Sequence, residues 1–295
     1  MRKICKKIAI ILSLLLMLYS PIQVFGLSKD KDIAREAHYA IAFDTESREI
    51  LYEKKAFDNV PMASTTKILT AILAINYGNL DDTVIISKNA ASIRGSKVGY
   101  KAGEEIKLKE LLFGLMYKSG NDAAIAIAEH IGGSISEFCV MMNDLARTMG
   151  LIDSNFESPH GLDSQNHYSS AYDLALLMAK AMENDTFKEI AGTKTTLKEK
   201  YGFTRDYNNI NKILWMIPEA NGGKTGTTGQ AGKCLVTSVN HNGRNIIIVV
   251  LNCPERWKVT ENIYNYIKEN YIIFLDEISK IKARSENIIK DNQNV

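Results

Sequence analysis

The sequence predicts an α+β fold in which an antiparallel sheet is flanked by helices, with an additional helical lobe. Two observations predict this fold class. The strand patterns lie towards the two ends of the chain, and the strongest are the Val- and Ile-rich runs at residues 233–240 and 245–251. The segments between the ends have the apolar spacing of helices. Strands at both ends with helices between them indicate a sheet packed on helices.

The individual elements follow from local patterns in chain order. Alternation at residues 38–43 and 49–52 predicts an amino-terminal hairpin with 44–48 as its turn, whereas 150–166 is mostly loop and 186–220 gives a mixed pattern. Asn242-Gly243 has the composition of a two-residue hairpin turn. Apolar periodicity predicts helices at 64–77, 109–117, 122–131, 136–149, 171–182 and 261–272, with a short strand at 83–87.

The first 26 residues have the pattern of a secretory signal peptide. A basic start at Arg2–Lys7 precedes an apolar run at Ile8–Leu18, which is shorter than the roughly 20 residues of a transmembrane helix. An uncleaved anchor that associates with the membrane is the alternative. Both interpretations place the remaining chain outside the cytoplasm, secreted or at the extracellular face of the membrane. The expected organisation is a leader at 1–26, one domain at 27–275 and a polar tail at 276–295.

Charge, cysteines and histidines exclude several function classes. The leader holds 4 of the 36 basic residues and none of the 34 acidic ones, so the rest of the chain shows no basic footprint for nucleic acid. Cys139, Cys234 and Cys253 give no disulfide framework, and the expected hairpin register makes a bridge between the last two unfavourable, so free thiols are expected. No pair of histidines has ligand spacing, and no metal is expected.

Three short strings carry most of the chemical information. They are Ser64-Thr65-Thr66-Lys67, Ser119-Gly120-Asn121 and Lys224-Thr225-Gly226, in this order. Together they supply a hydroxyl nucleophile with an amine three residues away, a second hydroxyl with an amide, and a cation beside a hydroxyl and a glycine. Acyl transfer onto a serine needs these groups when no histidine acts as the base.

Each string alone has an ordinary structural explanation. Ser64 also fits a helix N-cap, and the string at Ser119 fits a plain turn between helices. The string at Lys224 superficially resembles a phosphate loop, but Pro218 stands where that motif needs a glycine. The same short patterns recur at Ser28–Lys31, Ser279–Lys282, Ser87–Asn89, Ser164–Asn166, Ser238–Asn240, Ser285–Asn287 and Lys118–Gly120.

The placement of the strings favours catalysis. Ser64 starts a helix, where backbone N–H groups favour negative charge, and Lys67 follows one turn later on the same face. Asn121 lies in a break between two helices. Gly226 lies in a strand, where a missing side chain lets a ligand backbone approach closely. The sequence therefore predicts a serine acyl-transfer site in an exported protein.

Six segments, in this order, resemble one family. They are Pro61–Lys67, Lys97–Glu104, Lys118–Ala124, Ser158–Leu162, His167–Asp173 and Lys224–Cys234. The family is the low-molecular-weight penicillin-binding proteins, which are serine-type D-alanyl-D-alanine carboxypeptidases. The resemblance covers residues 35–275 and implies the catalytic domain without the C-terminal β domain. It implies a hydrolase without a cofactor that removes terminal D-Ala from peptidoglycan pentapeptide stems and is acylated by β-lactams.

The resemblance also implies a role for each site residue. Ser64 would attack the penultimate D-Ala carbonyl, and Lys67 would accept its proton as a neutral amine. Ser119 would pass a proton to the leaving D-Ala. Backbone N–H groups of Ser64 and Thr227 would form the oxyanion hole. Substrate binding is implied for Asn121, Lys224, Thr225, Gly226 and Thr227.

Two departures from the family and two other functions stay open. Residues 276–295 lack the clear apolar face of the anchor in larger members, and Thr227 stands where bulkier residues are frequent. A class A-like β-lactamase would need a carboxylate to activate water for deacylation. The best candidate, Glu157, lacks the Glu-x-x-Leu-Asn setting. A catalytically silent penicillin-binding or sensing module is the other alternative, although the serines and lysines of the three strings are intact.

Overall fold

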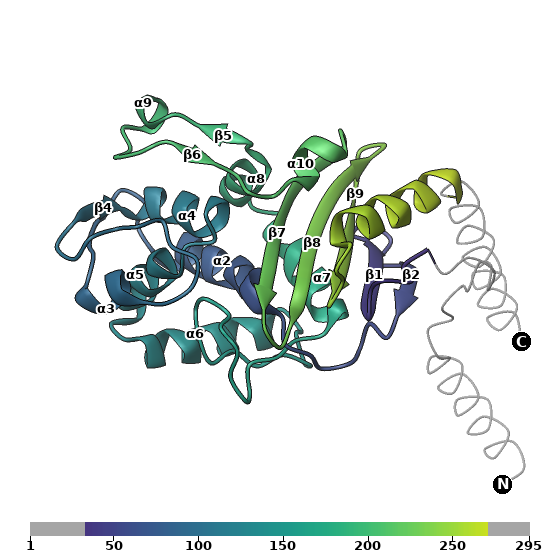
Figure 1. Ribbon diagram of the computed structural model, residues 1–295, viewed down its shortest axis with the longest axis horizontal. Coiled ribbons are helices and arrows are strands. Elements are labelled where there is room, and N and C mark those ends of the chain that lie inside the picture. Colours follow the sequence, from purple (N-terminus) through teal and green to yellow (C-terminus); the bar gives the residue numbers. More distant parts are fainter. Residues whose placement is uncertain (1–32, 271–295) are drawn as a thin grey trace, which may run out of the picture. The chain divides into compact units, whose positions relative to one another are not determined.

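The computed structural model describes residues 33–270, which form a five-stranded antiparallel sheet and a set of helices (Figure 1). The predicted leader and polar tail lie outside the described residues. The strand order is β2-β1-β9-β8-β7, so β7 lies at one edge of the sheet and the α+β class is confirmed. The strands are β1 (Tyr39–Asp44), β2 (Ile50–Lys54), β7 (Ala220–Thr228), β8 (Gly232–His241) and β9 (Arg244–Leu251).

The hairpin of β8 and β9 has the turn that its sequence predicts. Asn242 and Gly243 have φ angles of 53° and 86°, as a type I′ turn requires. The register pairs Leu235 with Val250, in agreement with the register expected from the turn. Free thiols are present at Cys139, Cys234 and Cys253.

Strand β9 is buried on both faces. Its odd-numbered residues from Ile247 to Leu251 join the main core, which the sheet shares with α2 (Lys67–Tyr77) and α7 (Ala171–Ala181). Its even-numbered residues from Ile246 to Val250 point to the opposite face, where the helix over residues 256–270 lies (Figure 1). Burial on both faces explains why the sequence of β9 is uniformly apolar rather than alternating.

The helical lobe is built around α2, whose residues from Lys67 to Ala74 are all buried. The helices predicted at 109–117, 122–131, 136–149 and 171–182 are confirmed, with ends that differ by one or two residues. Among residues 33–270 no single helix is long and apolar enough to span a membrane. One bent pair of helices, Asn121–Gly132 with Ile135–Thr148, has the length and composition of a membrane span, on those two criteria alone. The lobe comprises β3 (Thr83–Ile85), α3 (Lys88–Ser92), β4 (Glu105–Lys107), α4 (Leu108–Tyr117), α5 (Asn121–Gly132) and α6 (Ile135–Thr148).

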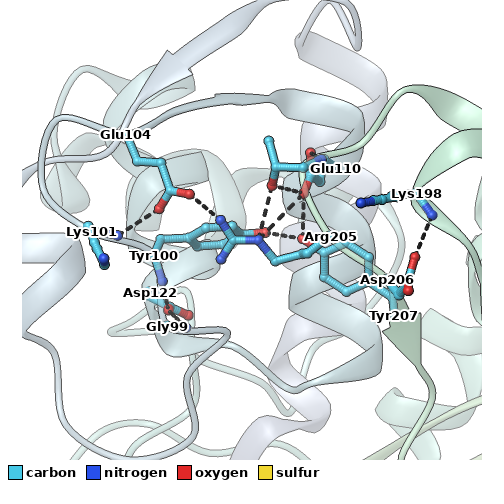
Figure 2. A network of polar contacts seen from close by, with 11 residues as sticks. Gly99, Tyr100, Lys101, Glu104, Glu110, Asp122, Lys198, Arg205, Asp206 and Tyr207 are labelled. Carbon is cyan, nitrogen blue, oxygen red and sulfur yellow. Dashed lines mark hydrogen bonds and ion pairs between the residues drawn. The ribbon is translucent and has the colours of Figure 1, made fainter.

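The mixed pattern of residues 186–220 corresponds to short elements that polar contacts hold in place. Glu110 of α4 is 1% exposed, and its carboxylate accepts hydrogen bonds from the Thr204 N–H at 2.9 Å and the Tyr207 hydroxyl at 2.8 Å (Figure 2). The Tyr207 hydroxyl in turn lies 2.7 Å from that of Tyr100. The short elements are α8 (Asp185–Gly192), β5 (Thr195–Thr196), α9 (Lys198–Tyr201), β6 (Tyr207–Asn208) and α10 (Ile213–Met216).

Replacing Glu110 with alanine is expected to detach this hairpin of β5 and β6. The buried Tyr207 hydroxyl and the Thr204 donors would lose their acceptor, which costs about 2–4 kcal/mol in the free energy of unfolding. Thermal unfolding and hydrogen exchange over residues 195–208 would measure the effect. Glu105→Ala is the control, because Glu105 is exposed on β4. Equal stability of the two variants would contradict the anchoring role of Glu110.

Candidate active site

Ser64 lies in a 3₁₀ turn, η1 (Ala63–Thr66), and helix α2 begins only at Lys67. The prediction of one continuous helix from residue 64 is therefore wrong at its start. Ala63, the first residue of this turn, has a left-handed φ of 52°, so no α-helix extends back through it. An alanine adopts this conformation at a cost of about 1 kcal/mol, so neighbouring groups must hold it.

A buried chain of hydrogen bonds holds Ala63 in its left-handed conformation. The Thr66 hydroxyl donates to the Ala63 carbonyl at 2.8 Å and lies 2.8 Å from His167 Nε2. Because His167 Nδ1 accepts from the Glu157 N–H at 3.0 Å, its proton resides on Nε2. Burial lowers the pKa of His167 to about 4, so the ring stays neutral. On the other side, a Cβ on Gly161 would lie 2.0 Å from the Ala63 oxygen, so only glycine fits.

The Lys67 amine is fully buried and contacts the Ser64 hydroxyl. Its Nζ lies 2.8 Å from Ser64 Oγ, 2.8 Å from Asn121 Oδ1 and 2.7 Å from the His160 carbonyl oxygen. The amide and carbonyl oxygens can only accept hydrogen bonds, whereas the serine hydroxyl can donate. A neutral amine can donate its two N–H groups to the two carbonyl oxygens and turn its lone pair to the Ser64 proton, for which the His160 carbonyl, 3.3 Å from Ser64 Oγ, is the other acceptor. This geometry is that of a general base and its nucleophile.

The electrostatics of the two buried lysines favour one charge, not two. Burial, with the Lys224 charge as the second cause, holds the pKa of Lys67 well below its usual range. Burial, followed by the charge of Arg256, lowers the pKa of Lys224 to about 7. The lowered pKa favours the neutral form of Lys67, and near neutral pH part of the Lys224 population is the cation.

The second string forms the break between α4 and α5. Ser119 has a φ of 56°, and Asn121 is the first residue of α5. The Asn121 Nδ2 group donates to the Arg94 carbonyl at 2.8 Å, which orients Oδ1 towards Lys67. The two interpretations of this string, a turn between helices and a part of the functional site, are therefore compatible, because the turn places Asn121 against Lys67.

The third string lies on the edge strand β7 and closes the site. Lys224 Nζ donates to Ser119 Oγ at 2.9 Å and to the Thr225 carbonyl at 2.7 Å. A Cβ on Gly226 would lie 2.9 Å from the Ser64 nitrogen, so the missing side chain lets β7 pass beside the nucleophile turn. The structure thus joins the three strings through two hydrogen bonds, one from Lys67 to Asn121 and one from Lys224 to Ser119.

Arg256 is a site residue that the sequence analysis missed. It lies at the start of the helix over residues 256–270, and its Nη1 donates to the Gly226 carbonyl at 2.8 Å and to Thr227 Oγ1 at 3.1 Å. It therefore fixes the end of β7 and adds positive charge beside Lys224. A single arginine 28 residues after Thr228 has no local pattern that would identify it.

Glu157 does not have the surroundings of a water-activating base. Its carboxylate accepts from the Ser164 hydroxyl at 2.5 Å and from the Asn166 N–H at 3.2 Å, and these residues are exposed. Hydrogen bonds, that from Ser164 first, lower the pKa of Glu157. Among the described residues no cluster of histidine, cysteine and carboxylate side chains is arranged to hold a metal ion.

Comparison of the sequence with known proteins identifies the family that the sequence motifs resemble. The family profile described as Peptidase_S11, D-alanyl-D-alanine carboxypeptidase, matches residues 26–255. The D-alanyl-D-alanine carboxypeptidase DacF of Bacillus subtilis is 34% identical over 82% of this chain and 64% of its own length. DacC of Escherichia coli is 35% identical over 73% of this chain and 56% of its own length. The chain thus matches between half and two thirds of the length of these two relatives.

Solved structures show the same fold. A D-alanyl-D-alanine carboxypeptidase from Mycobacterium tuberculosis superimposes with a TM-score of 0.76 at 28% identity, covering 83% of this chain and 95% of that one. A DD-transpeptidase from Streptomyces gives a TM-score of 0.73 at 30% identity, with 78% of this chain and 96% of that one covered. The sheet and helical lobe described above are therefore those of DD-peptidases.

Proposed function

The chain belongs to the serine D-alanyl-D-alanine carboxypeptidase family, and we propose on this basis that it removes the terminal D-Ala from peptidoglycan pentapeptide stems through a Ser64 acyl-enzyme. The observation that carries the proposal is the 2.8 Å contact between Lys67 Nζ and Ser64 Oγ inside a buried site. We infer the substrate class and the reaction from the relatives, and the mechanism from the contacts of the site residues.

Acylation begins when Ser64 Oγ attacks the carbonyl carbon of the penultimate D-Ala and its proton moves to the neutral Lys67 amine. The resulting oxyanion would lie between the N–H groups of Ser64 and Thr227, a contribution worth about 3–4 kcal/mol in other enzymes. Collapse of this intermediate breaks the peptide bond. Ser119, which is hydrogen-bonded to Lys224, passes a proton to the departing amine and is reprotonated by the proton that Lys67 accepted from Ser64, so that Lys67 is neutral again. Water then hydrolyses the Ser64 ester and regenerates the hydroxyl.

The cationic end of the site would bind the carboxylate of the leaving D-Ala. Lys224 Nζ contacts Ser119 Oγ at this end, and Arg256 adds positive charge close by; we expect the Thr225 hydroxyl to donate to the same carboxylate. A β-lactam carries a carboxylate and an activated amide in a similar arrangement, so we expect it to acylate Ser64. The position of the Glu157 carboxylate favours a slowly hydrolysed adduct over β-lactamase activity.

Mass spectrometry of the benzylpenicillin adduct, combined with D-Ala release from a pentapeptide, tests the proposal. The expected results are a covalent mass increase on the peptide that contains Ser64 and release of one D-Ala per stem. Rapid turnover of a chromogenic cephalosporin would favour the β-lactamase alternative. An adduct without D-Ala release would favour a silent penicillin-binding module.

The rate should have a bell-shaped dependence on pH. Activity rises as Lys67 loses its proton, because only the neutral amine can accept the serine proton. It falls above about pH 7, because Lys224, with a pKa of about 7, loses the charge that pairs with the substrate carboxylate. In the complex the bound carboxylate raises the pKa of Lys224, so Lys224 stays charged to higher pH there than in the free enzyme. As the pH rises above about 7, KM should therefore increase before kcat falls. Values of kcat and KM from pH 5 to 9 at constant ionic strength would measure this, and a KM independent of pH would contradict it.

We also propose that residues 1–26 direct export, which would place the domain at the outer face of the cytoplasmic membrane or free of it. The basic start and apolar run support this, and the family match begins at residue 26. Expression of the full chain followed by amino-terminal sequencing of the extracytoplasmic protein tests it. A new amino terminus close to residue 27 indicates a cleaved leader, and an intact chain in the membrane fraction indicates an anchor.

A further inference from the structure

The backbone N–H of Thr227 faces the free edge of β7. Thr227 pairs with Lys233 of β8, and the Lys233 carbonyl accepts from the Cys253 N–H at 2.8 Å, just beyond the end of β9. In an antiparallel ladder both backbone groups of a residue face the same neighbour, so those of Lys233 face β9 and those of Thr227 face away from β8. The Thr227 N–H therefore lies on the edge where the Gly226 backbone passes the Ser64 nitrogen.

The end of β7 that carries this N–H is held from two sides. Thr227 itself is exposed, and so is most of the turn that follows it. On one side Arg256 donates to the strand end through its Nη1. On the other side Asp163 Oδ1 accepts from the Thr228 hydroxyl at 2.5 Å, and its Oδ2 accepts from the Gln230 N–H at 3.1 Å. Asp163 thus ties the strand end to a separate loop.

That loop, residues 158–163, also contacts the nucleophile. The His160 carbonyl, three residues before Asp163, accepts from Lys67 at 2.7 Å and lies 3.3 Å from Ser64 Oγ. Gly161 packs so closely against the nucleophile turn that a Cβ has no room there. A short, fixed segment of chain therefore connects the turn that holds Ser64 to the strand end that Asp163 binds.

We propose that Asp163 is a positioning residue for the oxyanion hole, because through Thr228 it holds the Thr227 N–H at the place where the tetrahedral intermediate needs a donor. This inference rests on the proposed function. An oxyanion hole acts on the transition state more than on the bound substrate, so displacing one donor should lower kcat and leave KM nearly unchanged. Removal of a whole donor costs about 10²–10³-fold in kcat in other enzymes, and we expect displacement to cost about tenfold.

Thr228→Val tests the inference, because it removes the hydroxyl and keeps a side chain of similar shape. We expect kcat for D-Ala release from a pentapeptide to fall about tenfold, with KM within about twofold of the wild type. Thr228→Ser restores the hydroxyl and should restore kcat. A boronic acid that carries the acyl part of the stem peptide forms a tetrahedral adduct with Ser64 Oγ, and its affinity for Thr228→Val should fall by the same factor as kcat.

Ser164→Ala is the matched control, because it removes a hydrogen bond of the same kind and length, from Ser164 to Glu157 at 2.5 Å, one residue from Asp163. It should keep the wild-type kcat. Asp163→Ala should be at least as slow as Thr228→Val, and the double variant should be no slower than Asp163→Ala alone, because both substitutions remove one bond.

A wild-type kcat in Thr228→Val would overturn the inference, as would a loss confined to KM. Additive losses in the double variant would also overturn it, and so would a Thr228→Ser variant as slow as Thr228→Val. Thermal unfolding of the variants shows whether a lower kcat reflects a smaller folded fraction, in which case the inference is wrong as well. Absence of D-Ala release from the wild type would instead refute the proposed function.

Discussion

Replacing Ser64 with alanine is expected to abolish both D-Ala release and the benzylpenicillin adduct. The substitution removes the oxygen that forms the acyl-enzyme, and loss of a catalytic serine in comparable enzymes costs about 10⁴-fold or more. The fold should remain, because Ser64 is half-buried and, within residues 33–270, its hydroxyl has hydrogen bonds only with the Lys67 amine and the His160 carbonyl. Mass spectrometry for the adduct and a D-Ala assay measure the two losses.

Ser47→Ala is a suitable control for this experiment. Ser47 lies in the turn between β1 and β2, and its hydroxyl accepts one local hydrogen bond, from the Glu49 N–H at 3.4 Å. It should therefore keep both activities. A full adduct on Ser64→Ala would show that another residue is the nucleophile.

Replacing Lys67 with alanine should remove acylation almost as completely. A positioned general base contributes typically about 10²–10⁴-fold to the rate, and here the same amine also orients Asn121 and the His160 loop. We expect the rate constant for penicillin acylation to fall by about 10³-fold or more. Stopped-flow measurement with a fluorescent penicillin would give this constant directly.

A lysine-to-arginine exchange separates the base from the charge. Lys67→Arg retains a cation, but a guanidinium is not deprotonated in proteins and cannot accept the serine proton. Lys67→Arg should therefore be as inactive as Lys67→Ala. Recovery of acylation in the arginine variant would mean that the positive charge of this residue, and not its basicity, drives the reaction. Thermal unfolding of both variants shows whether the loss is local.

The sequence predicted those features that local patterns determine. Asn242-Gly243 determines a type I′ turn because both positions need positive φ, and the apolar period of residues 109–117 determines one helix face. The pairing of Ser64 with Lys67 follows from one turn of helical spacing, and the 2.8 Å contact confirms it. These predictions succeed because the interacting residues are close in the chain.

Other features depend on contacts between distant segments. Alanine is the best helix former, so nothing in the local sequence indicates that Ala63 is left-handed; Gly161 and the bond to Thr66 impose it. Glu110 lies 94 residues from Thr204, and the hairpin they join has too few apolar residues to show a period. Arg256 likewise reaches β7 only after the sheet has formed.

The left-handed alanine before the nucleophile also bears on the evolution of drug resistance. Ala63 is enclosed by Gly161 and Gly226, and neither glycine can gain a Cβ without meeting the nucleophile turn. We expect single amino-acid substitutions in the turn or at these glycines to slow D-Ala release from the natural stem peptide as much as they slow acylation by a β-lactam. On the proposed mechanism, we expect substitutions that weaken acylation by β-lactams but retain D-Ala release to occur at positions that the turn does not constrain, such as Thr227.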